Sequence, residues 1–516
     1  MGYRTISLQM STDYSAEELH RRIARQLGLR EFSYAIDKQS LEARRKGRVG
    51  WLVRVAVTSD QLDGVAPEVP PPLAIPPCRP GKKAVVVGSG PAGFFAALVL
   101  QKAGVKTTLI ERGADVDTRA RGIRTFEQTG IFDATNNYAF GEGGAGTLSD
   151  GKLTSRSKHI VRERQFILST YVEAGAPEEI RYLSHPHLGS DNLRRMVKRL
   201  RATFLGLGGE IRFETLLTDL TTRKSRVVEA ITTAGSLEAD TFVIASGHSA
   251  HETYRMLIGK GVTFRAKNFA IGCRIEHPQE LISMAQWGRK RLPGVKAAEY
   301  RLTSNADGRL PVYTFCMCPG GSIIPAAAYP HTNIVNGMSA YRRAGRFANA
   351  GCVVGIGLDR LLGREVPPLE ALDWLGSLEA DFYRHARGYA APYCGIGDFI
   401  GRIEPSGAVE SSYPLGLLPA RLWELLPEPV SVALGEGLKD FARKIKGFET
   451  GTIMGLESKT SAPIQVVRDP AGLCAGFENL YVAGEASGYA GGIVSSAADG
   501  IKAAMQIVTT ASARPG

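Results

Sequence analysis

The stretch KKAVVVGSGPAGFFAALVLQKAGVKTTLIER, residues 82–112, decides how the central part of the chain folds. Residues 84–87 are a short apolar run that is typical of a buried parallel strand. Gly88 allows a tight turn after this strand, Gly90 lets the backbone approach a pyrophosphate, and Gly93 lets the next helix pack closely on the sheet. The three glycines and their flanking elements predict a dinucleotide-binding fold.

The other parts of that fold are present in the same stretch. The helix after Gly90 offers free N–H groups and the positive end of its dipole to phosphates. The second strand ends in Glu111, about twenty residues after the glycines, where a carboxylate can accept hydrogen bonds from a ribose. We therefore expect cofactor contacts from Gly88, Gly90, Pro91, Ala92, Gly93, Glu111 and Arg112.

The composition limits the class of protein. With 516 residues the chain is too long for one ordinary core, so we expect two or three domains. Hydrophobic residues make up 44% and charged residues 22%, as in soluble globular proteins. The seven cysteines form no disulfide framework, which argues against a disulfide-stapled secreted protein. The net charge of +12 favours anionic partners.

The sequence also bears on localisation. The first twenty residues carry charges where a signal peptide would need an apolar core. The longest apolar stretch, residues 84–100, is interrupted by three glycines and a proline, so it fits a strand, turn and helix better than a membrane span. We therefore expect a cytoplasmic protein without a membrane partner.

Residues 1–65 predict a small α/β module. Strand-like runs at 3–10 and 51–57 flank a helical pattern opened by Ser15. The basic run Arg44, Arg45, Lys46 and Arg48 could touch nucleic acid, but no aromatic stacking pattern accompanies it, so we favour docking or oligomerisation. Residues 66–83, APEVPPPLAIPPCRPGKK, predict a stiff linker because proline cannot join a helix or a central strand.

The segment ENLYVAGEASGYAGGIVSSAADGIKAA, residues 478–504, resembles the C-terminal FAD motif of two-dinucleotide-fold flavoproteins. The resemblance implies a strand ending at Gly484, with Glu485 near the ribityl chain. It also implies that the helix after Gly491, Gly492 and Ile493 faces the flavin, where its dipole stabilises negative charge.

Two segments between these ends resemble further parts of such flavoproteins. SLEADTFVIASGHSA, residues 236–250, is similar to the strand and turn beside FAD, with the turn at Ala245, Ser246 and Gly247. GGEIRFET, residues 208–215, is similar to the strand that precedes it and runs past the adenosine half.

Seven stretches resemble a largely uncharacterised bacterial family of FAD-dependent dehydrogenases, and together they cover nearly the whole chain. They are FGEGGAGTLSDGKL (140–153), HPHLGSDNL (185–193), ASGHSAHETY (245–254), KNFAIGCRIEHPQ (267–279), YTFCMCPGG (313–321), NGMSAYRR (336–343) and the C-terminal motif. The glycine-rich first stretch can lie flat against a ligand. We expect it to line the cofactor with Gly143, Gly144, Ala145, Gly146 and Ser149, while Lys152 neutralises phosphate or a substrate carboxylate.

The expected fold class is α/β. It has a Rossmann-like FAD-binding domain from residues 84–264 and 451–516, an inserted mixed α/β substrate domain at 265–450, and the N-terminal module. Strand-like runs such as FAIGCRIE and LPVYTFCM alternate in the insert with helical ones such as LEALDWLGSLEADFYRHA. Residues 353–363, VVGIGLDRLLG, lack the third glycine and the acid of a second dinucleotide motif, so a dedicated NAD(P)H domain is not expected.

Cys316 and Cys318 lie at i and i+2 of a predicted strand, so their side chains share a face and their sulfurs are roughly 6–7 Å apart. That separation is long for a disulfide, although a turn at residues 319–321 could supply a bend. Zinc would need two further ligands that neighbouring residues do not offer, so no metal is expected. Packing, proton transfer by a thiol at the flavin, and a dithiol relay stay open.

His248 and Arg274 are catalytic candidates beside Cys316 and Cys318. His248 follows the flavin-proximal turn and could move a proton near neutral pH, or it caps a helix or packs. Arg274 and Glu276 share a strand face and either pair with each other or leave Arg274 to bind an acidic substrate.

These features predict an FAD-dependent oxidoreductase that transfers a hydride between flavin N5 and an unidentified small molecule, for which an acidic compound is one option. The alternatives are an NAD(P)H-using flavin reductase and a flavin-containing protein that binds or modifies nucleic acid. We favour a small-molecule substrate over nucleic acid, and the sequence leaves the oligomeric state open.

Overall fold

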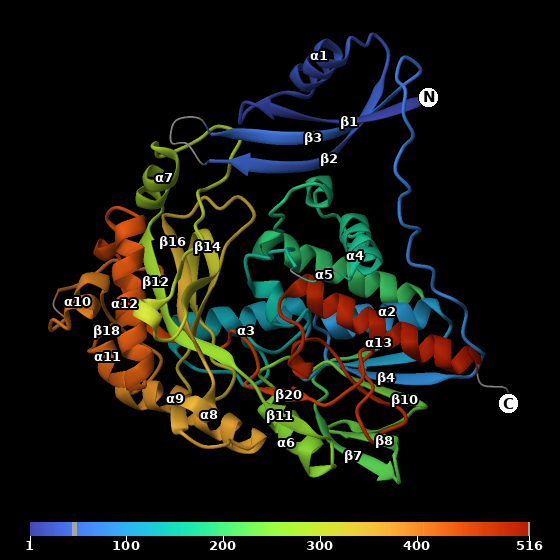
Figure 1. Ribbon diagram of the computed structural model, residues 1–516. Helices are drawn as coiled ribbons and strands as arrows, with labels where there is room; N and C mark the ends of the chain where they lie inside the picture. The colour runs from blue at the N-terminus through green and yellow to red at the C-terminus, as the bar shows by residue number, and fades with distance from the viewer. Residues whose placement is uncertain (44–48, 156, 158, 406, 514–516) are drawn as a thin grey trace.

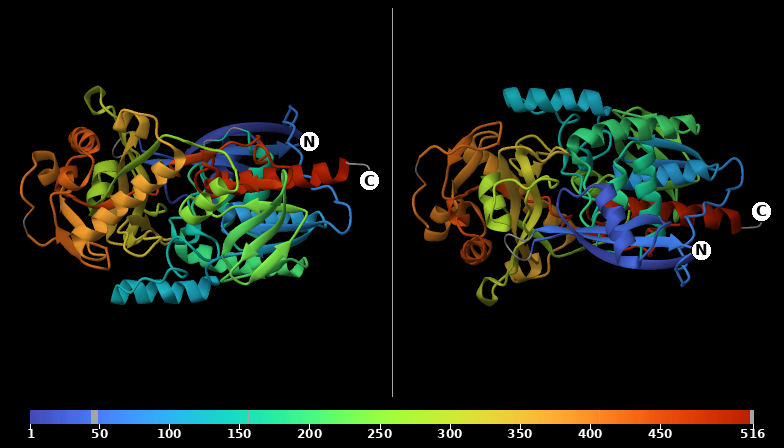
Figure 2. Two further views of the ribbon diagram at one scale, coloured as in Figure 1. Left: turned by 90° about the horizontal axis from the view of Figure 1, so that it is seen from below. Right: turned by 90° about the horizontal axis from the view of Figure 1, so that it is seen from above.

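The computed structural model describes residues 1–43, 49–155, 157, 159–405 and 407–513. The α/β architecture has a small N-terminal module, a parallel sheet with its helices, and a large mixed sheet with helices of its own (Figure 1). The two larger parts lie side by side when the molecule is seen from below or above (Figure 2). The basic run at residues 44–48, on which the nucleic-acid alternative depended, lies outside the described residues.

The N-terminal module is a three-stranded antiparallel sheet in the order β1 (Gly2–Met10), β3 (Gly50–Ser59), β2 (Ser33–Glu42). Helix α1 (Ala16–Leu27) packs on it through the buried Leu19 and Ile23, and the hydroxyl of Ser15 caps this helix by accepting the Glu18 N–H at 3.1 Å. The predicted strand, helix and strand are confirmed.

Residues 66–82 contain no helix or strand, in agreement with their prolines, and run along one side of the molecule to β4 (Figure 1). The module is joined to the rest of the chain by backbone hydrogen bonds. The N–H of Gln39 donates to the carbonyl of Tyr182 at 2.8 Å, and the N–H of Ser184 donates to the carbonyl of Gln39 at 2.9 Å. The module therefore docks on the body of the protein.

The parallel sheet has the order β21 (Leu480–Val482), β10 (Thr241–Ile244), β4 (Lys83–Val87), β5 (Lys106–Ile110), β6 (Glu210–Arg212). Val86 and Val243 face a helical layer of α2 (Pro91–Lys102), α4 (Val161–Glu173), α5 (Gly189–Gly206) and α13 (Ile493–Ala513). The alternate residues Val85 and Phe242 face the opposite way, as expected for strands buried on both faces.

A three-stranded antiparallel sheet, β7 (Leu217–Arg223), β8 (Arg226–Thr232) and β9 (Gly235–Glu238), shares the core on that opposite face. The two-stranded pair β11 (Phe264–Ala266) and β20 (Ile464–Val466) joins the two larger parts. The remaining elements of this half are α3 (Val116–Thr129), α6 (His251–Gly259) and the 3-10 helices η1 (Ala145–Leu148), η2 (Glu178–Arg181) and η5 (Gly484–Ser487).

The large sheet has the order β13 (Thr303–Ser304), β14 (Val312–Pro325), β16 (Phe347–Ile356), β12 (Phe269–Pro278), β19 (Thr452–Glu457), β17 (Ala391–Gly395), β18 (Leu417–Pro419), and β15 (Val335–Met338) pairs with β14. Its neighbours are antiparallel except β17 and β18. Its helices are α7 (Gln279–Trp287), α8 (Leu358–Leu362), α9 (Pro368–Ala386), α10 (Ile396–Gly401), α11 (Leu422–Leu425) and α12 (Glu428–Lys444), with η3 (Ala306–Gly308) and η4 (Phe448–Thr450).

One predicted boundary needs correction. Residues 451–457 were expected in the FAD-binding part, but Thr452–Glu457 form β19 between β12 and β17 in the large sheet. The reason is that both β12 and β19 are almost completely buried, so the backbone groups of β12 need a partner on each side. The crossing back to the parallel sheet occurs after this strand.

Candidate active site

A cavity of about 440 Å³ lies between the parallel-sheet part and the large sheet. Most residues that the sequence assigned to the cofactor line it: Gly88, Gly90, Pro91, Ala92, Glu111, Arg112, Gly144, Ala145, Gly146, Ser149, Ala245, Ser246, Gly247, Glu485, Gly491, Gly492 and Ile493. Cys316, His248, Lys152, Asn336 and Lys459 also line it. The cavity thus brings together segments that are far apart in the sequence.

Three predicted cofactor residues, Gly93, Gly143 and Gly484, lie behind the wall of this cavity. Gly93 has a packing role, because a Cβ there would be 1.8 Å from the carbonyl oxygen of Gly88. Gly484 is similar, since a Cβ would be 2.5 Å from the Cβ of Ala92. These glycines let the turn after β4 and the helices α2 and α13 approach each other closely.

The carboxylate of Glu111 organises the turns around it. It accepts hydrogen bonds from the Ser89 N–H at 2.9 Å and hydroxyl at 2.8 Å, and from the Gly113 and Gly141 N–H groups at 3.0 Å each. The guanidinium of neighbouring Arg112 pairs with Glu252 and lies 3.8 Å from the centre of the Phe140 ring. Glu111 therefore joins the first glycine turn to the glycine-rich loop, a role that the sequence did not suggest.

Arg119 holds the glycine-rich loop in shape and was missed by sequence reasoning. Its fully buried guanidinium donates hydrogen bonds to five backbone carbonyls, those of Asn137, Tyr138, Gly141, Glu142 and Gly144. Burial lowers the pKa of Arg119 to about 10, although nearby carboxylates oppose this shift. The loop thus depends on a side chain from α3, whose sequence carries no sign of it.

Two hydroxyl groups in the cavity wall lack a hydrogen-bond partner among the residues that the structure describes. The Oγ atoms of Ser246 and Ser496 are buried and make no hydrogen bond to other described groups. Buried polar atoms are nearly always hydrogen-bonded, so this cavity suits a ligand with several acceptors. Together with the glycine turns and the start of α13, the donor set fits the phosphates and ribityl chain of FAD.

His248 and Glu485 face each other in the same wall. Nδ1 of His248 lies 2.5 Å from Oε2 of Glu485, whose Oε1 accepts the Gly492 N–H at 2.8 Å. Burial raises the pKa of Glu485, but His248 and the other donors outweigh it and the net shift is downward. The carboxylate is therefore kept ionised, and it fixes the orientation of the imidazole ring.

Strand β14 carries the two cysteines on the opposite wall. Cys316 has a φ of +43°, and the pairing of β14 with β16 shifts between Phe315 and Cys318 and again before Gly321. The expected bend after Cys318 is thus accompanied by an irregularity at Cys316 itself. Cys316 lines the cavity, whereas Cys318 is completely buried behind it and donates to the carbonyl of Cys316 at 3.2 Å.

Arg274 lies fully buried on β12, behind the cysteines. It pairs with Glu457 at 2.7 Å and not with Glu276, which was one of the two alternatives from the sequence; Glu276 instead bonds to Ser412. The guanidinium of Arg274 also donates to the Cys316 carbonyl at 2.7 Å and approaches the sulfur of Cys318 at 3.5 Å. Arg274 is not among the residues that line the cavity.

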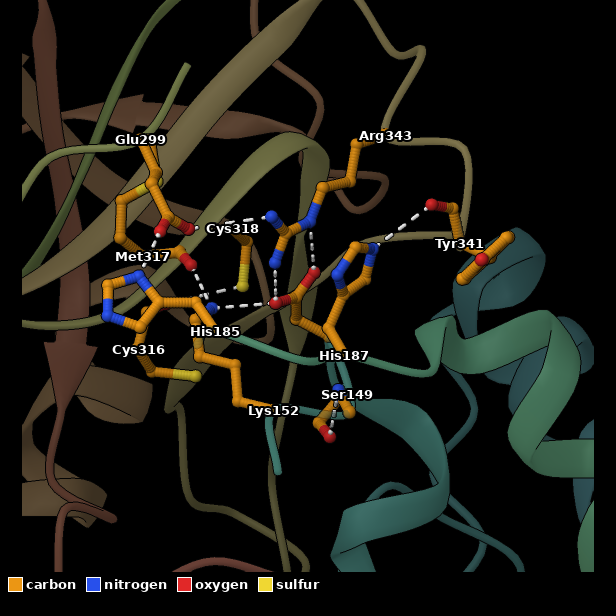
Figure 3. A network of polar contacts seen from close by, with 12 residues as sticks. Ser149, Lys152, His185, His187, Glu299, Cys316, Met317, Cys318, Tyr341 and Arg343 are labelled. Atoms are coloured by element: carbon orange, nitrogen blue, oxygen red, sulfur yellow. Dashed lines mark hydrogen bonds and ion pairs between the residues drawn. The ribbon is translucent and has the colours of Figure 1, made fainter. Parts of the chain in front are cut away.

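A second network, centred on Asp150, surrounds the cysteines from the side of the glycine-rich loop (Figure 3). Lys152 donates to Asp150 at 2.7 Å and to the carbonyl of Met317, and Arg343 donates to Asp150 at 2.5 and 3.0 Å. Burial opposes ionisation of Asp150, but Lys152 and Arg343 hold its pKa well below the usual range. Asp150 and Arg343 lie in two of the seven family stretches, which was the one signal that pointed to them.

Glu457, the partner of Arg274, is a fully buried carboxyl. Burial raises its pKa to about 7, Arg274 lowers it, and smaller effects come from Cys316 and His248. Cys316 and His248 are therefore both within electrostatic reach of the same carboxyl. Within the described ranges, no three His, Cys, Asp or Glu residues are gathered as a metal ion would require.

Two family models match the chain. One is described as an FAD binding domain and matches residues 82–232, and the other is described as FAD-dependent protein, C-terminal domain-like, and matches residues 268–460. A relative from Clostridium beijerinckii, named "Uncharacterized protein", is 37% identical over 530 residues, which cover 98% of this chain and 99% of the relative. This chain belongs to a family of FAD-dependent oxidoreductases.

Solved structures show only a general similarity to this FAD-dependent oxidoreductase. CtdE in complex with FAD is 12% identical, with a TM-score of 0.33, over 84% of this chain and 91% of that one. Glycine oxidase from Bacillus cereus is 11% identical, with a TM-score of 0.33, over 83% and 95%. A geranylgeranyl bacteriochlorophyll reductase-like protein from Thermoplasma acidophilum is 14% identical, with a TM-score of 0.36, over 83% and 79%.

The cofactor of this oxidoreductase is FAD, as expected, and the predicted fold class is confirmed. Every helix in the described part of the chain is too short or too polar to pass through a lipid bilayer.

Proposed function

We propose that the protein is a dehydrogenase that acts on a small anionic molecule bound at the large-sheet end of the cavity. The observation that carries this proposal is the cavity itself, which is lined by backbone-rich glycine turns on one side and by reactive side chains on the other. Bound FAD supplies hydride exchange at its N5 atom. Everything else in the reaction has to come from the side chains that line the cavity.

We also propose how the chain is divided. Residues 1–65 would be a docking module, 66–83 a linker, 84–264 with 458–516 the FAD-binding domain, and 265–457 the substrate domain. The separate sheets and the course of β19 support this division. The cofactor would be held by the predicted glycine turns and by Glu111, Arg112, Ser246 and Glu485.

The positions of two lysines support the proposal that the substrate is anionic. Lys152 and Lys459 both line the cavity, one from the glycine-rich loop and one from the segment after β19. Each has a carboxylate partner behind it, Asp150 at 2.7 Å and Glu379 at 2.8 Å. A substrate carboxylate would therefore meet two oriented ammonium groups without large rearrangement. Arg274, already saturated by protein partners, would position the wall rather than bind substrate.

His248 is the proposed proton acceptor. When Nδ1 donates its bond to Glu485, the neutral ring has its lone pair on Nε2. An imidazole in this tautomer can remove a proton near neutral pH, and it is held in place by the carboxylate. His248 and Lys459 both line the cavity.

The test is anaerobic mixing of the FAD-loaded protein with fractionated pools of acidic metabolites, followed by the loss of flavin colour. We expect one fraction to bleach the flavin in the wild type. His248→Asn retains a donor for Glu485 but lacks Nε2, so bleaching should slow by about 100-fold or more while FAD content stays the same. His159→Asn, at an exposed imidazole, is the matched control.

NADPH is added in a parallel experiment. Rapid bleaching by NADPH, with no response to any metabolite fraction, would replace this proposal with an NAD(P)H-using flavin reductase. Equal rates for His248→Asn and the wild type would remove His248 from the proton transfer.

A further inference from the structure

The backbone at Cys316 has a conformation that non-glycine residues rarely adopt. Its φ of +43° lies inside strand β14, at a place where the pairing with β16 is shifted. On a regular strand two sulfurs at i and i+2 are roughly 6–7 Å apart. Here the thiol of Cys318 donates a hydrogen bond to the carbonyl of Cys316 at 3.2 Å, inside this irregular stretch.

Cationic side chains hold this irregularity from both sides. Lys152 donates to the carbonyl of Met317, and Arg274 donates to the carbonyl of Cys316, so both carbonyls between the two sulfurs are fixed. The same two cations lie near the sulfurs, with Arg274 at 3.5 Å from Cys318. The local structure therefore both brings the two thiols together and places positive charge around them.

The two thiols differ in access and in acidity. Cys316 lines the cavity, whereas Cys318 is fully buried. The neighbouring Cys318 side chain lowers the pKa of Cys316, and Lys152 and Arg274 act in the same direction against burial, while the pKa of Cys318 is raised. A cavity-lining thiol of lowered pKa beside a buried thiol is the arrangement of an attacking and a resolving cysteine.

Other buried cysteines of the same sheet provide an internal comparison. Cys273, Cys352 and Cys394 lie in β12, β16 and β17, and burial raises the pKa of each. They behave as small apolar side chains in the core. Packing accounts for these three cysteines, but it gives no reason for a strained backbone and two cations at Cys316.

We propose that Cys316 and Cys318 are a redox-active dithiol that reduces the disulfide of a small thiol compound. This inference rests on the proposed function, because it names the electron acceptor that the dehydrogenase leaves open. Together with the hydride half of the reaction, it makes the protein an oxidoreductase that passes two electrons from a small metabolite to a disulfide.

The electrons and protons of this step balance within the named groups. The Cys316 thiolate attacks one sulfur of the substrate disulfide, which breaks the S–S bond and releases one thiolate. The Cys318 thiol loses its proton to that leaving thiolate and attacks the Cys316 sulfur, which releases the second thiolate. The products are a Cys316–Cys318 disulfide, one small thiol and one small thiolate, so the dithiol loses two electrons and the substrate disulfide gains them.

The experiment uses the FAD-loaded protein and oxidised glutathione as the disulfide probe. We expect the wild type to release two molecules of glutathione per chain and to lose two alkylatable thiols, with the new disulfide mapped to Cys316 and Cys318 by peptide mass spectrometry. Cys318→Ser should stop at one glutathione bound to Cys316, and Cys316→Ser should bind none. Cys78→Ser, in the linker, should behave as the wild type.

A second measurement is the rate of alkylation as a function of pH. Because the pKa of Cys316 is lowered, its alkylation at pH 6 should exceed that of Cys78 by at least about tenfold. A wild type in which Cys316 and Cys318 both stay alkylatable after glutathione treatment would overturn the dithiol, whatever the flavin experiment shows. If this disulfide forms normally but no metabolite fraction bleaches the flavin, the redox-active dithiol is supported and the proposed dehydrogenase is contradicted.

Discussion

The two walls of the cavity recognise their ligands with different parts of the chain. The wall from the parallel sheet presents backbone N–H groups in glycine turns, at Gly88 to Gly90, Gly144 to Gly146 and Gly491 to Gly492. The wall from the large sheet presents side chains, above all Cys316, Asn336 and Lys459. The first wall is rich in backbone donors, and the second places polar side chains opposite it.

The difference lies in what holds each wall in place. Close packing that only glycine permits shapes the first wall, as at Gly93 against Gly88. Buried charges shape the second, where Arg274 and Glu457 form an ion pair with no exposed atoms and Arg343 pairs with Asp150. Substitutions should therefore break the two walls in different ways.

The largest loss of stability is expected for Arg274→Met, on the second wall, which the large sheet provides. Removing the guanidinium leaves Glu457 as an uncompensated buried charge, so the free energy of unfolding should fall by about 3–5 kcal/mol. Denaturant titration measures it. Arg421→Met, at an exposed arginine paired with Glu404, should change the free energy of unfolding by less than about 1 kcal/mol. Equal effects of the two substitutions would show that the buried pair does not hold the wall.

A smaller loss of stability is expected for Gly93→Ala, behind the first wall, which the parallel sheet provides. The new Cβ would be 1.8 Å from the Gly88 carbonyl oxygen, so α2 must move, at a cost of about 1–3 kcal/mol. FAD content after purification should fall with it. Gly376→Ala, in the middle of α9 with no atom within 4 Å of the new Cβ, should stabilise the protein by about 0.5–1 kcal/mol. Retention of full FAD content by Gly93→Ala would contradict a wall built by close packing.

The smallest change in stability is expected for Glu142, a buried carboxyl in the glycine-rich loop. Burial raises its pKa to about 6, although the Val116 N–H and Arg201 oppose the shift. The native state thus binds this proton more tightly than the unfolded chain, so its stabilisation is present below pH 4.5 and is lost as the pH rises through 6. The unfolding free energy of wild type minus that of Glu142→Gln should fall by about 2 kcal/mol between pH 4 and 7. A difference that stays constant with pH would show that Glu142 is not buried as described.

The same contrast explains what the sequence could predict. Backbone recognition requires glycine at fixed spacing beside strands, so residues 82–112 and 478–504 predicted most of the first wall. All five strands of the parallel sheet were expected. The meander β7 to β9 went unnoticed, because its short strands carry no motif.

Side-chain recognition left no comparable pattern. Arg119 lies in an ordinary amphipathic helix, and its five carbonyl partners become visible only when the loop is folded around it. Arg274 was noticed, but it was assigned the neighbour Glu276 because sequence reasoning sees residues on one strand and not Glu457 from the next one. To predict contacts between residues that are distant in the sequence, the register of the sheet must be known, and the sequence alone does not supply it.

The parallel sheet takes its strand β21 and the start of α13 from the last part of the chain, next to β10 and α2. During synthesis, the ribosome therefore releases the first glycine turn long before the segment that completes the pocket exists. The cofactor can be enclosed only after translation is essentially finished. A message truncated before residue 478 would yield a protein that carries every early signature of a flavoenzyme and stays colourless.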